Sequence, residues 1–487
     1  MNKTISFTAV VLLTVLLVTE KTASGAKKAP SLKKPNVVLI LADDMGYADI
    51  ERFGHLEIPT PALNRLVDEG VKFTDAYVTA PICVASRMGF MSGRHQQRFG
   101  VYCNFHKNNQ LELFKKATLM PVPFQQAGYR TGLVGKWHLA GNSNSASEAG
   151  WMYPGPLTRG FDECVAITSG GSSYWAGAKI MRQETVEKSQ SYLTDLWGVE
   201  AAAFVERNAK NPFFLYLGFN AVHSPMHARD EDMAPFEKSI KDPNRRIYAG
   251  MLRSMDRAIG GVLDQLDKHG IADNTIVIFL NDNGGGGSTK QYSSHSRNWA
   301  SNKPFRGHKF DIFEGGVRVP MMMRWPARLK AGSVYGELVS SADVYRTVVS
   351  AANLKMPNET FDSVNLLPYL TQNKTGVPHE WLCWQNRSWL PKEVGGHVSA
   401  KTRIHNSAIR KGDWKLLRLD EDIDSNDDPP AWQLYDLASD VGEQKDIVAE
   451  HPEVVRELAK LFDQWSANMH PSIAPIMNSK YRPKKRK

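Results

Sequence analysis

Cysteine is scarce in this 487-residue chain, which contains only Cys83, Cys103, Cys164 and Cys383. A framework of several disulfides, which holds many small secreted domains together, is therefore excluded. A chain of this length can bury a large core without one. The sequence leaves open which of these cysteines pair and which are buried free thiols.

Long apolar runs are also absent beyond the first twenty residues. Lys3 precedes an apolar stretch at residues 5–18, and small residues follow at 23–26. This order predicts a signal peptide over residues 1–26, removed on export to the periplasm or the exterior. The alternative is an uncleaved anchor, but the stretch is short for a membrane span. We therefore expect no stable membrane insertion after cleavage.

A concentrated basic face outside the C-terminal tail is lacking as well, although the formal net charge is +9. Most of the excess comes from the basic cluster at residues 480–487, and the remainder is too dispersed to form a duplex-binding face. No nucleic-acid partner is expected. With 42% hydrophobic and 23% charged residues, the composition is that of a soluble globular protein, for which the length suggests two domains.

What the chain does contain is an alternation of buried strands and helices. Strands are predicted at 37–42, 131–134, 213–219 and 275–280, and helices at 61–69, 196–208 and 248–269. This alternation predicts an α/β fold with a large, mostly parallel (mixed) sheet flanked by helices. The larger predicted domain spans residues 27–375.

The pattern changes after a polar stretch at residues 370–378. A hairpin is predicted at 407–419 with Gly412 near its turn, followed by a strand at 433–437 and a helix at 452–469. Residues 376–487 are therefore predicted to form a smaller C-terminal subdomain with a short antiparallel sheet, one helix and a basic tail.

Acidic and amide side chains directly follow two of the predicted buried strands. Asp43 and Asp44 end the first, and Asp282 and Asn283 end the last. Ligands of parallel sheets collect at the carboxyl ends of the strands, and oxygen-only donors suit Ca²⁺ or Mg²⁺ better than zinc. A helix cap or turn is the alternative for either pair alone. The four glycines at 284–287 are expected to form a flexible bend, since the residues of a P-loop do not follow.

Cys83 lies four residues before Arg87 on a segment that is typical of the first turn of a helix. This spacing places both side chains on one helix face. The helix N-terminus adds unsatisfied N–H groups and the positive end of a dipole. The pattern predicts a nucleophile beside an anion-binding pocket.

These features occur within a longer series of motifs that resembles the type I sulfatases of the alkaline-phosphatase superfamily. The resemblance covers nearly the whole mature length. The matching blocks are residues 41–47, Cys83 to Arg94, 135–139, 159–162, 223–225, 281–284, 305–309, 314–320, 408–415 and 434–437. The resemblance implies a secreted sulfate-ester hydrolase.

In that family the motif cysteine is oxidised to formylglycine (3-oxoalanine), the catalytic aldehyde. The resemblance implies that Cys83 is this residue. It further implies a Ca²⁺ ion held by Asp43, Asp44, Asp282 and Asn283, with the modified Cys83 side chain completing the coordination.

The resemblance also assigns catalytic roles to basic residues. Arg87 would stabilise the hydrated aldehyde, and Lys136 and His138 would contact the aldehyde and the sulfate. Because Lys136 and His138 are two residues apart, an extended segment would point them to the same side. His223, the candidate general acid for the leaving alcohol, and Lys309 would lie on the leaving-group side. His227 and His308 have no assignable counterpart and are taken as candidate pocket lining only.

Two positions depart from the family pattern. Phe310 follows Lys309, where a small residue is usual, and Ala85 stands where proline is commoner. The oxygen-dependent formylglycine-generating maturase generally prefers proline there. We therefore expect an anaerobic radical-type maturase as the partner that converts Cys83.

Two alternatives remain at this stage. A phosphoester or phosphonate hydrolase of the same superfamily would share the chemistry of tetrahedral anions, but such relatives more often use two zinc ions and more histidine ligands. A non-catalytic glycan-binding protein would keep Cys83 unmodified. The expected substrate is a sulfated carbohydrate, for which tryptophans in predicted loops could provide stacking surfaces: Trp175, Trp299, Trp384 and Trp389.

Overall fold

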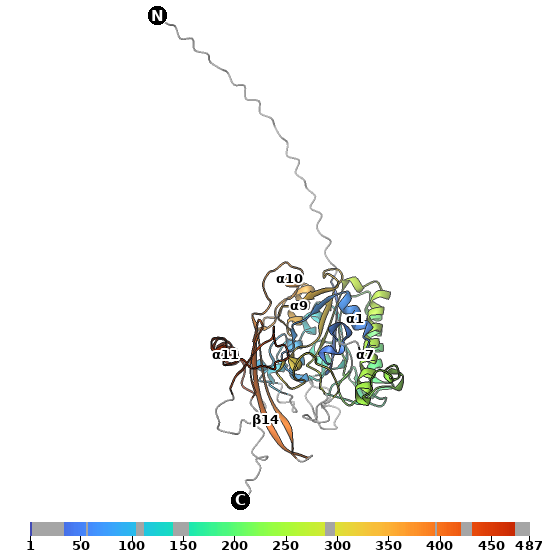
Figure 1. Ribbon diagram of the computed structural model, residues 1–487. Coiled ribbons are helices and arrows are strands. Elements are labelled where there is room, and N and C mark those ends of the chain that lie inside the picture. Colours follow the sequence, from blue (N-terminus) through green and yellow to red (C-terminus); the bar gives the residue numbers. More distant parts are fainter. Residues whose placement is uncertain are drawn as a thin grey trace. The chain divides into compact units, whose positions relative to one another are not determined.

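A ten-stranded mixed sheet forms the centre of the molecule (Figure 1). The computed structural model describes Met1 and residues 34–54, 57–103, 112–139, 155–287, 298–394, 397–419 and 431–472, with the side chains of 387–405 left out. The strand order is β11-β2-β10-β9-β1-β8-β4-β5-β6-β7. The rest of the predicted leader, residues 2–26, lies outside the described residues.

The middle of this sheet is parallel, as the sequence predicts. The parallel strands are β9 (Thr275–Asn281), β1 (Asn36–Ala42), β8 (Phe213–Gly218), β4 (Arg130–Lys136) and β5 (Glu163–Ile167). Three of these strands, β1, β8 and β9, are buried along their whole length, which explains their continuous apolar runs.

Shorter strands extend both sides of the parallel core. Antiparallel pairing joins β10 (Met321–Arg324) to β9 and to β2 (Val71–Phe73), and joins β6 (Lys179–Arg182) to β5 and to β7 (Thr185–Lys188). At the far edge β11 (Ser333–Tyr335) runs parallel to β2. The predicted mixed α/β fold is therefore confirmed.

Helices cover both faces of this sheet. Val37, Leu39 and Leu41 of β1 face α2 (Cys83–Ser92), α4 (Pro121–Gln126) and α9 (Asp343–Ala351) in one apolar cluster. The alternate residues Val38 and Ile40 face the other cluster, with α1 (Pro61–Asp68), α5 (Leu193–Asn208) and α7 (Pro243–Lys268). Helix α7 packs against α5 and also against α1, beside which it lies in Figure 1.

The C-terminal part forms a separate four-stranded antiparallel sheet and one helix, as predicted. Its strands are β13 (Trp381–Val394), β14 (His397–Lys411), β15 (Trp414–Arg418) and β16 (Gln433–Asp436). Gly412, with φ 55°, lies in the turn between β14 and β15. Ile409 and Leu416 pack against α11 (Pro452–Ala467), whereas Ala408 and Leu417 pack against the main part.

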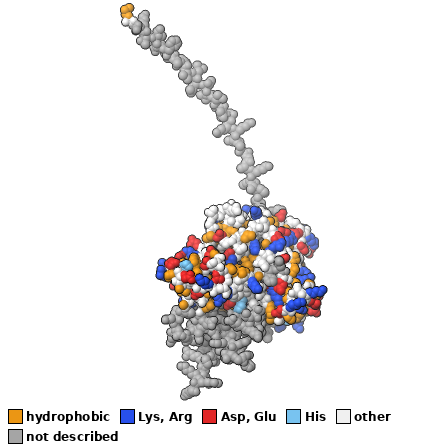
Figure 2. Space-filling model, viewed as in Figure 1, with side chains coloured by type: hydrophobic (Ala, Val, Ile, Leu, Met, Phe, Trp, Pro, Cys, Tyr) orange, Lys and Arg blue, Asp and Glu red, His pale blue; other side chains and the backbone are white. Residues whose placement is uncertain are grey.

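Short elements complete the described chain: β3 (Ala76–Tyr77), β12 (Val339–Ser340), α3 (Glu112–Lys115), α6 (Asp230–Met233), α8 (Glu314–Val317) and α10 (Leu367–Leu370). All four cysteines are free thiols. Among the described residues, no helix combines the length and the apolar character needed to cross a membrane. On the face in Figure 2, basic and acidic side chains lie among one another.

Candidate active site

Four neighbouring parallel strands bring the predicted site residues to one edge of the sheet. Asp282 and Asn283 follow β9, Asp43 and Asp44 follow β1, and the loop after β8 carries His223. Ala42 pairs with Asn281 in register, so the two acidic segments leave the sheet side by side. The backbone N–H of Asp44 donates to Oδ1 of Asp282 at 3.3 Å.

Each buried carboxylate of this edge pairs with a buried cation. Nε of Arg87 lies 2.9 Å from Oδ2 of Asp282, and Nζ of Lys309 lies 2.7 Å from Oδ2 of Asp44. The ammonium of Lys136, the last residue of β4, pairs with Asp43. Arg87 also donates to the Tyr216 hydroxyl and to the carbonyl oxygen of Lys136, each at 3.1 Å. Residues from five separate segments therefore form one charge-balanced cluster.

Cys83 is the first residue of α2 at this cluster. The helix begins here because Ile82 is extended, with φ −152° and ψ 133°. Arg87 follows one turn later on the same helix. Burial raises the pKa of the Cys83 thiol, although the charges of Lys309 and Lys136 oppose this effect. As a thiol this side chain is neutral and a poor nucleophile.

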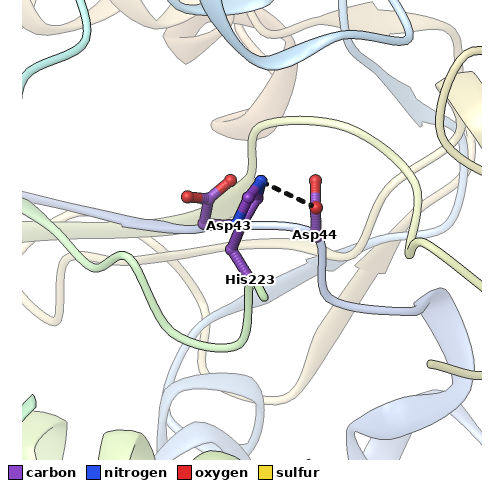
Figure 3. Close-up of side chains that lie close together, drawn as sticks. All are labelled: Asp43, Asp44 and His223. Atoms are coloured by element: carbon purple, nitrogen blue, oxygen red, sulfur yellow. Dashed lines mark ion pairs between the residues drawn. The ribbon is translucent and has the colours of Figure 1, made fainter. Parts of the chain in front are cut away.

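Two histidines, His223 and His138, border the same cluster, and Figure 3 shows His223 beside Asp43 and Asp44. Nε2 of His223 lies 3.5 Å from Oδ2 of Asp44, and its Nδ1 is hydrogen-bonded to the Ser224 carbonyl oxygen. That contact assigns the proton of a neutral ring to Nδ1 and leaves the Nε2 lone pair toward Asp44. Burial, followed by the charge of Lys309, lowers the pKa of His223 to about 3. Burial and the charge of Lys136 lower the pKa of His138 well below its usual range.

The backbone conformation that brings His138 to the site differs from the prediction. Strand β4 ends at Lys136, and His138 has a φ of 56°. The extended continuation expected through both residues is therefore wrong, because the chain turns after the strand. The charge of Lys136 nevertheless acts on the His138 ring, so both side chains serve the same region.

The oxygen donors at the strand ends fit a hard cation. Oδ1 of Asp43 and Oδ1 of Asn283 are buried and have no hydrogen-bond partner. Ligand atoms of Asp43, Asp44 and His223 lie within 4.8 Å of one another (Figure 3). Buried acceptors without a donor are costly unless a cation satisfies them, and carboxylate and amide oxygens suit Ca²⁺.

The pKa values of Asp44 and Asp282 shift in opposite directions. Burial would raise the pKa of Asp44, but the charges of Lys309 and His223 lower it to about 2. At Asp282, burial and the charge of Asp43 together raise the pKa. The case for a divalent cation therefore rests on the unpartnered oxygens of Asp43 and Asn283 and not on a net negative charge.

Several residues that support the site were not predicted. Nδ2 of Asn298 donates to the Asp44 carbonyl oxygen at 2.6 Å, and its Oδ1 accepts from Gly286 N–H at 3.0 Å. Tyr216 contacts Arg87 from β8. Gly170 lies so close to His138 that a Cβ there would be 2.6 Å from Nε2. None of these positions carries a local sequence signal, because each acts through tertiary contacts.

Gly284, the first residue of the glycine run, is closely packed against another backbone segment. A Cβ on Gly284 would lie 1.8 Å from the Gly315 carbonyl oxygen, and Gly284 N–H donates to the Gly316 carbonyl oxygen at 3.0 Å. This crowding gives Gly284 a packing role that the sequence did not predict, and the flexible bend stays a prediction. Glycine is needed here because two backbones meet.

The two histidines taken as candidate lining lie at the periphery. His308 is 3.1 Å from Oδ2 of Asp311 and packs against Gly287. The His227 ring stacks on Trp175, with 5.6 Å between ring centroids. Of the other tryptophans considered for sugar contacts, Trp384 is buried, Trp299 is half-buried, and the side chain of Trp389 lies outside the described residues.

Comparison with known proteins agrees with this geometry. Residues 35–354 match the family model described as Sulfatase, and residues 307–468 match the one described as N-sulphoglucosamine sulphohydrolase, C-terminal. The chain is 32% identical to the N-acetylgalactosamine-6-sulfatase of Homo sapiens, over 72% of this chain and 68% of that protein.

Solved structures show the same fold. The crystal structure of Ps i-CgsB in complex with k-i-k-neocarrahexaose matches with a TM-score of 0.76 and 30% identity, over 91% of this chain and 94% of that one. The phosphonate monoester hydrolase of Agrobacterium radiobacter, at 18% identity and a TM-score of 0.61 over 89% and 96% of the two chains, shares the fold alone. The chain therefore belongs to the sulfatase family and is a sulfuric ester hydrolase.

Proposed function

We propose that this sulfatase removes sulfate from a sulfated glycan, using formylglycine made from Cys83 and a bound Ca²⁺ ion. The observation that carries the proposal is the set of buried ion pairs around the start of α2: Arg87–Asp282, Lys136–Asp43 and Lys309–Asp44. These cations give an anionic ester a dry, preorganised binding site beside residue 83. The relatives named for N-acetylgalactosamine-6-sulfate and bound to a carrageenan oligosaccharide support a glycan as substrate.

Asp43, Asp44, Asp282 and Asn283 would hold the Ca²⁺ ion, together with the side chain of residue 83. The ion supplies charge that orients the sulfate and withdraws electron density from its oxygens. Its fit rests on the orphaned oxygens of Asp43 and Asn283. No zinc-like histidine cluster occurs among the described residues, where the candidate metal group is Asp43, Asp44 and His223.

Formylglycine supplies a hydrated aldehyde as the nucleophile that attacks sulfur. Arg87, fixed by Asp282, Tyr216 and a backbone carbonyl, stabilises that group. Lys136 and Lys309 bind the sulfate oxygens. The neutral His138 accepts a proton when sulfate is expelled and the aldehyde is regenerated.

His223 is the proposed general acid for the leaving alcohol. In the free protein burial keeps its ring neutral, with a pKa of about 3 and the Nε2 lone pair toward Asp44. A sulfate ester beside the ring brings a negative charge, which raises the pKa of His223. The proton for the leaving oxygen is then carried on Nε2.

Hydrolysis and modification can be tested together. The protein is produced with a maturase, the mass of the Cys83 peptide is measured by mass spectrometry, and hydrolysis of 4-methylumbelliferyl sulfate, a phosphonate monoester and sulfated oligosaccharides is followed. We expect a thiol-to-aldehyde mass shift and turnover of the sulfates. Cys83→Ala should keep the fold and bind Ca²⁺ without turnover. Preference for the phosphonate, or unimpaired Cys83→Ala activity, contradicts the proposal.

Ala85 supports the further proposal that the maturase is of the anaerobic radical type. Co-expression with each type of maturase, followed by mass spectrometry of the Cys83 peptide, tests which enzyme converts Cys83. Full conversion by the oxygen-dependent enzyme alone would overturn it.

The predicted leader at residues 1–26 supports export to the periplasm or the exterior, which fractionation of the expressing cells would check.

A further inference from the structure

The segment after β5 runs past both site histidines. A Cβ on Gly170 would lie 2.6 Å from Nε2 of His138, and one on Gly171 would lie 3.8 Å from the His223 ring. The buried Tyr174 hydroxyl donates to the His223 carbonyl oxygen at 2.7 Å and also to the Asn220 carbonyl oxygen. The segment is thus anchored to the loop that carries His223.

Trp175 follows this anchor and faces solvent. Its side chain is 42% exposed, and it is the aromatic member of the large exposed hydrophobic residues in the described part of the chain. The His227 ring stacks on it at 28° between planes, and Tyr192 supports it from the side, 5.5 Å away. One face of the indole is therefore supported while much of the ring stays open.

The exposed part of the Trp175 ring leaves a flat apolar surface open to a ligand. Tryptophan is usually buried because of its large apolar area, and its flat face suits the apolar face of a pyranose ring. Because its ring is already held by two neighbours, little conformational entropy is lost on binding. The hydroxyls of Ser172 and Ser173 lie beside it in the chain.

We propose that Trp175 is a stacking platform for a sugar ring of the substrate, adjacent to the sugar that carries the cleaved sulfate. Trp175 is four residues from Gly171, which places their Cα atoms at most about 15 Å apart. An oligosaccharide bound with its sulfate between His138 and His223 can therefore reach the indole. This proposal rests on the proposed function. It predicts that the ligand is a sulfated oligosaccharide longer than one sugar.

The test compares a short and a long substrate. Trp175→Ala should raise KM for an iota-carrageenan or chondroitin sulfate oligosaccharide about tenfold, the effect expected for one buried aromatic contact. Its kcat/KM for 4-methylumbelliferyl sulfate should stay within about twofold, because an aryl sulfate does not reach the platform. Trp175→Phe should recover most of the loss. Val199→Ala, which shortens another exposed apolar side chain, serves as control.

Failure of this inference differs from failure of the proposed function. If the wild type hydrolyses no sulfate ester, the proposed function fails, and calorimetric binding of the same oligosaccharides still tests the platform. Equal oligosaccharide binding or turnover by Trp175→Ala and the wild type overturns the platform. An equal loss on the aryl sulfate, or no oligosaccharide binding by the wild type, overturns it too.

Discussion

Asp44 is held at both its carboxylate and its backbone, by different residues. Lys309 pairs with the carboxylate at 2.7 Å, and Nδ2 of Asn298 donates to the carbonyl oxygen at 2.6 Å. Asn298 also donates to the Val222 carbonyl oxygen at 3.2 Å, next to His223. One amide therefore ties a predicted metal ligand to the loop of the predicted general acid.

Asn298→Ala should weaken Ca²⁺ binding because the backbone of Asp44 loses its support. Removing a group that orients metal ligands typically lowers metal affinity by roughly 10–100-fold. Calorimetric Ca²⁺ titration of the variant and the wild type measures the change. Asn208→Ala is the control, since the side-chain amide of this buried asparagine donates to the Phe204 carbonyl oxygen of its own helix, α5. Unchanged Ca²⁺ affinity in Asn298→Ala would contradict the role.

Gly170→Ala should impair catalysis without unfolding the protein. The new Cβ would lie 2.6 Å from Nε2 of His138, so the ring must move. Displacing a catalytic group by about 1 Å can lower activity by roughly 10²-fold. Gly171→Ala is a matched control, because its Cβ would meet the His223 ring at an ordinary 3.8 Å. Steady-state kinetics and thermal unfolding of both variants decide; equal activity of the two rejects this prediction.

At the scale of elements, apolar runs made the parallel core predictable. Strands β1 and β9 are buried on both faces, so periodicity and length identified them. Strands β2, β6 and β10 are only three or four residues long, and nothing local distinguishes them from loops. The edge of the sheet that carries the site was also predictable, because its acidic and amide residues directly follow these strands.

Site residues also differed in whether the sequence alone could place them in the site. Asp43, Asp44, Asp282 and Asn283 follow strands directly, so strand prediction alone placed them together. His138 reaches the site through a turn with positive φ, and Asn298 arrives from a segment far from any predicted strand. Positions of this second kind depend on tertiary packing, which the local pattern does not encode.

The start of α9 contains a pH-sensitive ion pair. Nε2 of His379 lies 2.8 Å from Oδ2 of Asp343, whose carboxylate also accepts from the N–H groups of Ser340 and Val364. Burial opposes the charged ring, but the charge and hydrogen bond of Asp343 raise the pKa of His379 above its ordinary value. The protonated ring therefore favours the folded state.

This pair should make stability fall as the pH rises. Its contribution is complete below the unfolded histidine pKa of about 6.5 and is lost as the pH passes through the raised folded value. Denaturant unfolding at several pH values, at constant Ca²⁺, should show a loss in the wild type that His379→Gln lacks. Because other groups titrate in both proteins, the difference between them is the measure, and a constant difference would refute the assignment.

At the scale of the molecule, a buried ionic network joins the C-terminal sheet to the main part. Lys415 of β15 lies 2.8 Å from Oε1 of Glu314 and 3.0 Å from Oε1 of Glu443, and all three side chains are fully buried. Arg318 also pairs with Glu314, at 3.2 Å. Burial opposes ionisation of Glu314, but Lys415, Arg318 and Arg410 lower its pKa to about 2, so Glu314 is charged, whereas burial raises the pKa of Glu443 to about 7. Glu314 directly precedes the Gly315–Gly316 backbone that packs on Gly284 beside the metal ligands.

Lys415→Met should therefore destabilise the whole protein and not only the C-terminal sheet. Removing one partner leaves Glu314 and Glu443 buried without their shared cation, a change that costs roughly 3–5 kcal/mol in unfolding free energy. Lys411→Met on the neighbouring strand is the matched control, since its pair with Glu457 is exposed and such pairs contribute about 0–1 kcal/mol. Denaturant unfolding compares the two, and Ca²⁺ titration reports whether the loss reaches the strand-end site through Gly315 and Gly284. A small, equal effect of both substitutions would mean that the network does not couple the C-terminal sheet to the active site.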